Sequence, residues 1–180
     1  MKNLNVVLVI MTALCLSFIS CQNKQTQEEL AKFKQIEATE AVNIEIVKQG
    51  YAHLDKFMNE TDRKAFIDLY SADSKCFGGS AEQSISLEDM VQFITLWYSA
   101  FPDLTHQLNN IIAKGDYVVV QVKYTGTQEK EFMGIPASGK KIESKGVHIF
   151  KLAEGKITEM YTLDDDFTMF QQLGQELKSK

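Results

Sequence analysis

The acidic triplet Asp164-Asp165-Asp166 is the feature of the sequence best suited to acid/base chemistry. It follows an alternating run that predicts a strand and precedes a stripe of apolar residues, three apart, that predicts a helix. Strand alternation turns Asp164 and Asp166 away from a face that is shared by Ile157, Glu159, Tyr161, Leu163 and Asp165. Asp165 at such a junction is either a helix N-cap or a catalytic acid/base, and the spacing alone leaves both interpretations open.

The elements that would position this carboxylate change period at Pro102. Before Pro102, spacings of three and four residues predict a helix over about 37–58 and another over about 87–100. Between them they predict a short helix capped by Thr61 or Asp62, followed by a turn at 71–75. After it, period-two alternation predicts strands over 104–113, 117–125, 140–152 and 157–163, the first two joined by a turn at 114–116. Helices followed by an antiparallel meander indicate an α+β domain.

Four ordered motifs carry a family resemblance. They are Trp-Tyr-Ser-Ala-Phe-Pro-Asp-Leu at 97–104, Gly126-Thr127, the loop at 132–140, and Tyr161 with Asp165 and Gln-Leu-Gly at 172–174. Together they resemble the SnoaL-like polyketide cyclase (ester cyclase) family. The resemblance implies a curved antiparallel sheet wrapped around a long helix, with a cone-shaped apolar cavity. This is the nuclear-transport-factor-two-like fold, which ketosteroid isomerase shares.

The resemblance also implies chemistry. Family cyclases close a ring by an intramolecular aldol step, without metal or cofactor, after a proton next to a carbonyl is removed. Asp165 matches the family's acid/base Asp, and an apolar cavity would raise its pKa. Gln128 stands where the family commonly has a His; it can donate a hydrogen bond but cannot transfer protons near neutral pH. The expected substrate contacts are Tyr161, Trp97, Phe101, Phe132 and His148, while His106 is a further candidate on a strand.

Two function classes follow from these motifs. One is a cofactor-free cyclase or isomerase that acts on a small apolar molecule containing a carbonyl group. The other is a binding or protein-interaction module of the same fold that lacks the reaction. We expect a homodimer, because this fold often pairs its sheets. A net charge of −5 without any basic run gives no reason to expect a nucleic-acid partner.

The N-terminal residues predict export. Lys2 and an apolar run over 4–19 form a signal peptide over residues 1–20, and Ser20-Cys21 resembles a bacterial lipoprotein junction at which Cys21 is lipidated. An ordinary secretory signal cut near Ser20 is the alternative. Residues 21–36 are expected to be a polar tether and 37–180 the SnoaL-like domain, held at the membrane of the bacterial cell envelope. Cys76 is expected to be a buried, inert thiol.

Overall fold

The computed structural model describes residues 2–78 and 83–176, with side chains from residue 24 onward except residue 25. The chain divides into two compact units, Met1–Thr39 and Glu40–Lys180. Helix α1 (Lys2–Leu54) contributes residues to both. Residues 21–36, the expected polar tether, are therefore helical; their Gln, Lys, Glu and Ala residues are good helix formers. Cys21 and the predicted signal peptide have side chains outside the described set.

No helix among the described residues is both long and apolar enough to cross a membrane.

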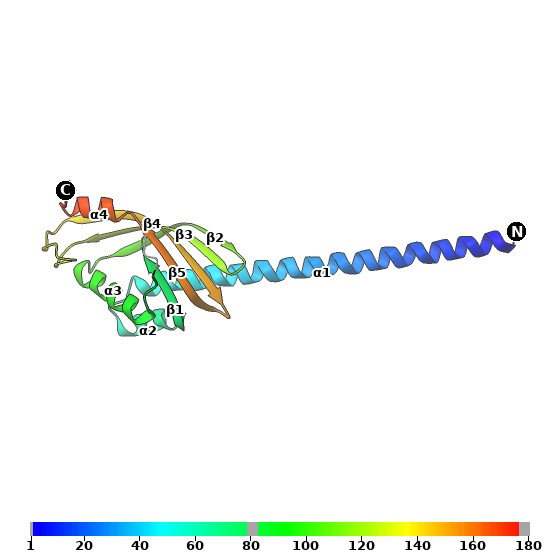
Figure 1. Cartoon of the computed structure of the whole chain (residues 1–180), viewed down its shortest axis with the longest axis horizontal. Helices are drawn as coiled ribbons and strands as arrows, with labels where there is room; N and C mark the ends of the chain where they lie inside the picture. The colour runs from blue at the N-terminus through cyan, green and yellow to red at the C-terminus, as the bar shows by residue number, and fades with distance from the viewer. Residues whose placement is uncertain (1, 79–82, 177–180) are drawn as a thin grey trace. The chain divides into compact units, whose positions relative to one another are not determined.

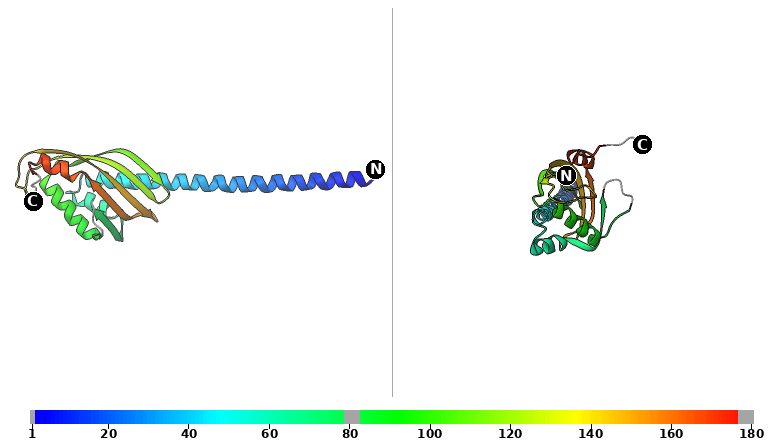
Figure 2. Two further views of the ribbon diagram at one scale, coloured as in Figure 1. Left: turned by 45° about the horizontal axis from the view of Figure 1, so that its top comes forward. Right: turned by 90° about the vertical axis from the view of Figure 1, so that its left-hand side faces the viewer.

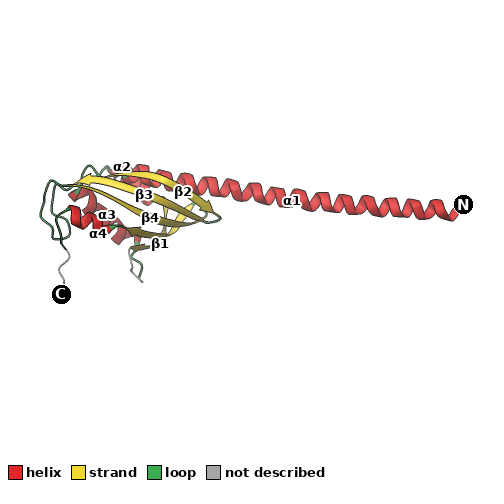
Figure 3. Cartoon of the chain, turned by 90° about the horizontal axis from the view of Figure 1, so that it is seen from above, coloured by secondary structure: helices red, strands yellow, loops and turns green. Residues whose placement is uncertain are grey.

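The second unit contains a five-stranded sheet and three further helices (Figure 1). The helices are α2 (Glu60–Ile67), α3 (Leu87–Ala100) and α4 (Asp166–Gln172). The strands, in the order β1-β5-β4-β3-β2, are β1 (Tyr70–Gly78), β2 (Thr105–Lys114), β3 (Tyr117–Thr127), β4 (Lys141–Ala153) and β5 (Lys156–Asp164). The strands bend around the helices, and α2 and α3 lie on one side of the sheet (Figures 2 and 3). This architecture confirms the predicted α+β fold class.

Strand β1 is the exception to the predicted antiparallel order. It pairs with β5 in parallel, with Cys76 opposite Met160, whereas 71–75 was interpreted as a turn. The small polar residues of this segment resemble turn chemistry. They form a strand because β1 is an edge strand whose alternate residues Tyr70, Ser74 and Cys76 are buried. Asp73 and Lys75, at the other positions, remain in solvent.

A bulge in β5 changes which acidic side chains face inward. Leu152 of β4 pairs with Ile157, but the preceding Lys151 pairs with Glu159, so β5 contains one extra residue at this point. Such a bulge shifts the alternation by one position. Ile157 is buried, yet Tyr161 and Leu163 are exposed, while the residues that face the interior beyond the bulge are Met160, Thr162 and Asp164. The prediction that Ile157 and Tyr161 share a face is wrong for this reason.

Local sequence sets both ends of α3, and the residue after its end packs closely against β3. Ser86 and Asp89 form a capping box at its start, and Pro102 follows two residues after its end. Phe101 is fully buried there. A Cβ atom at Gly126 would lie 3.3 Å from the Cβ of Phe101, so the strand can pass this close because Gly126 has no side chain.

Candidate functional site

An apolar cavity of about 420 Å³ lies between the inner face of the sheet and the helices of the second unit. Most of its wall is aromatic or aliphatic, including Trp97, Tyr98 and Phe93 of α3. Cys76 also lines it, and burial raises the pKa of this thiol to about 11, which agrees with the expectation of an inert cysteine. The polar groups of the wall are few, and its imidazole and carboxyl side chains are those of His106, His148, Asp164 and Asp166.

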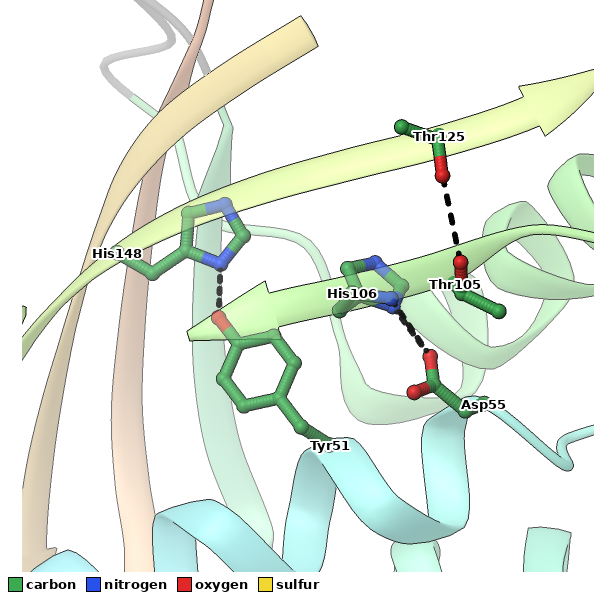
Figure 4. Close-up of polar contacts among 6 residues, drawn as sticks. All are labelled: Tyr51, Asp55, Thr105, His106, Thr125 and His148. Carbon is green, nitrogen blue, oxygen red and sulfur yellow. Dashed lines mark hydrogen bonds and ion pairs between the residues drawn. The ribbon is translucent and has the colours of Figure 1, made fainter. Parts of the chain in front are cut away.

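His106 is held by a carboxylate from the end of α1. Asp55 Oδ1 lies 2.7 Å from His106 Nδ1 and also accepts a hydrogen bond, 3.1 Å long, from the His106 backbone N–H (Figure 4). A carboxylate only accepts hydrogen bonds, so Nδ1 must carry a proton. In the neutral ring Nε2 then has a free lone pair, and no described residue hydrogen-bonds to it. This is the arrangement of an oriented base.

His148 connects a phenol and a second carboxylate. Its Nδ1 lies 2.6 Å from the Tyr51 hydroxyl and its Nε2 lies 3.1 Å from Asp164 Oδ1. Tyr51 comes from α1, and its ring stands between the two histidines (Figure 4). Burial, together with nearby Tyr70, Asp164 and Asp55, raises the pKa of the Tyr51 hydroxyl well above its usual value. Tyr51 is therefore a neutral hydrogen-bond donor at physiological pH.

Asp164 reaches His148 because the strand beside it carries a glycine. Gly146 pairs with Asp164 across β4 and β5, and a Cβ atom at Gly146 would lie only 2.1 Å from Asp164 Oδ1. Any other residue at this position would push the carboxylate away. Asp166, one position into α4, also lines the cavity, and burial followed by repulsion from Asp164 and Asp165 raises its pKa.

Asp165 is a helix cap, and the prediction that it lies inside the cavity is wrong. Its carboxylate accepts the backbone N–H of Thr168 at 3.1 Å as the N-cap of α4, and it is not among the cavity residues. Hydrogen bonds from Thr168 hold the pKa of Asp165 below its ordinary value, whereas burial was expected to raise it. The bulge in β5 and the start of α4 give Asp164 and Asp166 the inward positions instead.

Replacing Asp165 with Asn should leave the melting temperature almost unchanged, because Asn caps helices as well as Asp does, whereas Ala should lower it. A carboxyl with a lowered folded-state pKa stabilises the fold above its unfolded pKa and loses that contribution as the pH falls through the folded value. The difference between the parent and the Ala variant should therefore shrink in acid. Thermal melts at neutral and acidic pH check this. Equal losses for Asn and Ala would contradict the cap.

Of the other predicted site residues, some line the cavity and some are buried behind its wall. Trp97 and His148 line the cavity, as does His106. Phe101 and Phe132 are fully buried but outside its wall, where each packs against Trp97.

Tyr161 and Gln128 do not lie where expected. Tyr161 is on the outer face of the sheet because of the bulge, where it stacks on Phe77 and donates to Glu159. Gln128 is fully buried, but its amide holds the loop at 132–140, the central loop: it donates to the Ile135 carbonyl and accepts from Ser138. Neither residue lines the cavity.

Sequence reasoning missed Tyr51 and Asp55 as functional residues. Tyr51 belongs to the apolar stripe of its helix, which is typical of a core residue, and Asp55 follows at the helix end. Their partners lie 97 and 51 residues away along the chain. The available signal was weak: a tyrosine and an aspartate four residues apart lie on one helix face. Among the described side chains, no group of three or more His, Cys, Asp or Glu residues could hold a metal ion.

Comparisons with known proteins agree with this fold. The family model for SnoaL-like polyketide cyclase matches residues 48–173, and no curated protein matches the chain. The structure of AclR, a candidate hydroxylase from Streptomyces galilaeus, is 23% identical, with 78% of this chain and 86% of that chain covered and a TM-score of 0.70.

Two further solved structures carry the family's description in their own names. A candidate SnoaL-like polyketide cyclase from Jannaschia sp. CCS1 is 25% identical, with 77% and 95% of the two chains covered and a TM-score of 0.69. IdmH, a candidate polyketide cyclase from Streptomyces antibioticus, is 27% identical over 71% and 98% of the two chains, with a TM-score of 0.59. With the family model matching well over half of its length, this chain belongs to the SnoaL-like polyketide cyclase family.

Proposed function

We propose that this protein transfers protons, without a cofactor, at a carbon next to a carbonyl group of a small apolar molecule bound in the cavity. The observation that carries the proposal is the His106–Asp55 pair, in which Nδ1 donates to the carboxylate and Nε2 keeps a lone pair on a ring that lines the cavity. A base positioned in this way typically accelerates proton removal by about 10²–10⁴-fold. His106 therefore takes the role that the family resemblance assigned to Asp165.

The cavity wall suits such a substrate. Its aromatic and aliphatic residues would bind an apolar ring, and a carbanion next to a carbonyl is stabilised as an enolate by any hydrogen-bond donor near the oxygen. The proposal agrees with the ring-closing chemistry named in IdmH and the Jannaschia protein. An aldol ring closure or an isomerisation both begin with this proton transfer.

Solvent deuterium exchange is the direct test. The protein is incubated in deuterated buffer with α-tetralone and with cyclohexanone, and proton NMR follows the loss of the hydrogens next to the carbonyl. We expect exchange faster than in a buffer blank, with α-tetralone favoured because its fused aromatic ring fills more of the cavity. Binding of α-tetralone without any exchange above the blank would overturn the proposed reaction.

The second candidate is binding without catalysis. It is favoured by a specific observation, since the two residues through which the family resemblance implied catalysis, Asp165 and Gln128, serve a helix cap and a loop. The same exchange experiment decides between the two, because a binding module would shift ligand signals in NMR and leave the exchange rate at the level of the blank.

We also propose that the chain is exported and held at the membrane through a lipid on Cys21. The support is Lys2, the apolar run that follows and the Ser20-Cys21 junction. Replacing Cys21 with Ser should move the protein out of the membrane fraction of cells that express the full chain. A variant that stays in the membrane fraction as fully as the parent would contradict the anchor.

A further inference from the structure

Tyr51 ends a hydrogen-bonded chain that begins at a carboxylate. Asp164 Oδ1 lies 3.1 Å from His148 Nε2. His148 Nδ1 in turn lies 2.6 Å from the Tyr51 hydroxyl, a contact drawn in Figure 4. The ring centroid of Tyr51 is 5.5 Å from that of His106, the proposed base. All four residues line the same cavity. The Tyr51 ring thus lies beside the proposed base, and its hydroxyl is bonded to a second histidine–carboxylate pair.

The carboxylate fixes the direction of these hydrogen bonds. Asp164 only accepts, so His148 Nε2 carries a proton in both charge states of the ring. In the neutral ring Nδ1 has no proton and accepts the Tyr51 O–H, which occupies the only donor of the phenol. In the protonated ring Nδ1 donates to the phenol oxygen, and the Tyr51 O–H is free to turn toward a ligand. Protonation of His148 therefore releases a donor into the cavity.

We infer that Tyr51 is a catalytic residue that donates its hydrogen bond to the carbonyl oxygen of the substrate when His148 is protonated, and that His148 and Asp164 are positioning residues for it. This inference rests on the proposed function. When His106 Nε2 takes the proton from carbon, the electrons of the C–H bond form a carbon–carbon double bond and the carbonyl oxygen becomes negative. That oxygen receives the Tyr51 proton, Tyr51 receives the Nδ1 proton of His148, and His148 becomes neutral.

The two histidines then have opposite requirements. His106 must be neutral to act as a base, and His148 must be protonated to release Tyr51, so the exchange rate should depend on pH as a bell. The titratable groups that line the cavity with His148 include Asp164 of β5, Asp166 of α4, Tyr70 of β1, Tyr98 of α3, Tyr124 of β3, and His106 of β2 with its partner Asp55 after α1.

A matched pair of ligands tests the donor without any catalysis. α-Tetralone and tetralin have nearly the same shape, but only α-tetralone has an oxygen that accepts a hydrogen bond. Their affinities are measured by NMR titration between about pH 5 and pH 8, the range in which histidine titrates. We expect the parent protein to prefer α-tetralone, and the preference to grow as the pH falls. Tyr51→Phe should reduce it by about three- to tenfold, and His148→Gln should remove its pH dependence.

Tyr117→Phe is the matched control, because Tyr117 is exposed and lies outside the cavity, and it should keep the full preference. A Tyr51→Phe variant that folds and keeps the preference would overturn the inference, as would a preference in the parent that grows with rising pH. In the exchange assay, Tyr51→Phe should raise KM by about the factor lost in affinity for α-tetralone and should also lower kcat, because the hydrogen bond made in the ground state strengthens as the oxygen becomes negative. A parent that shows the preference but no exchange would refute the proposed reaction while leaving the donor site established.

Discussion

Replacing His106 with Gln is expected to lower the rate of deuterium uptake by α-tetralone by about 10²–10⁴-fold, the usual contribution of a positioned general base. Gln is polar and of similar reach, and its amide can donate to Asp55 as Nδ1 does. It cannot accept a proton near neutral pH, so the variant removes the chemistry and keeps the contact. Proton NMR in deuterated buffer gives the rate, and a ligand titration shows that α-tetralone still binds.

His53 provides the matched control. Its Nδ1 lies 2.9 Å from Asp62 Oδ1, so it forms a histidine–carboxylate pair of similar geometry, but it does not line the cavity. His53→Gln should leave the exchange rate at the level of the parent. Equal rates for the parent and a folded His106→Gln variant would remove His106 as the base, and Asp166, a carboxyl of the cavity wall with a raised pKa, would then be tested next.

Replacing Phe101 with Ala should lower the free energy of unfolding by about 3–5 kcal/mol, the usual cost of truncating a buried Phe. Its ring is fully buried, 5.4 Å from the ring of Trp97 and 5.3 Å from that of Phe132, with Gly126 against its Cβ. These neighbours come from α3, the central loop and β3, so they cannot easily move together to fill the space. Chemical denaturation of the parent and the variant measures the difference.

Phe167→Ala is the control for this effect. Phe167 lies in α4 and is 48% exposed, so its removal should change the free energy of unfolding by no more than about 0.5 kcal/mol. If Phe101→Ala were as mild as this control, then the cluster around Trp97 would be loosely packed. The cavity wall would then lack the rigid support that positions Trp97.

Several features followed from the sequence because they depend on neighbours along the chain. The end of α3 before Pro102 and the turn at Gly115 each depend on a few adjacent residues, and the structure has both. The strands after Pro102 were predicted from their alternation. The family followed from four motifs in order, and the match over residues 48–173 confirms it.

The tertiary structure decided which residues meet in the cavity. The bulge near Thr158 appears only when β5 is paired with β4, and it turns Asp164 inward and Tyr161 outward. The site itself joins residues that are distant along the chain: Tyr51 with His148, and Asp55 with His106. Periodicity places a side chain on one face of its own helix or strand, but strand register and helix packing decide what that face meets. For this reason the sequence predicted a cavity with a carboxylate in it, and only the folded chain showed that two histidines line that cavity, each bonded to a carboxylate.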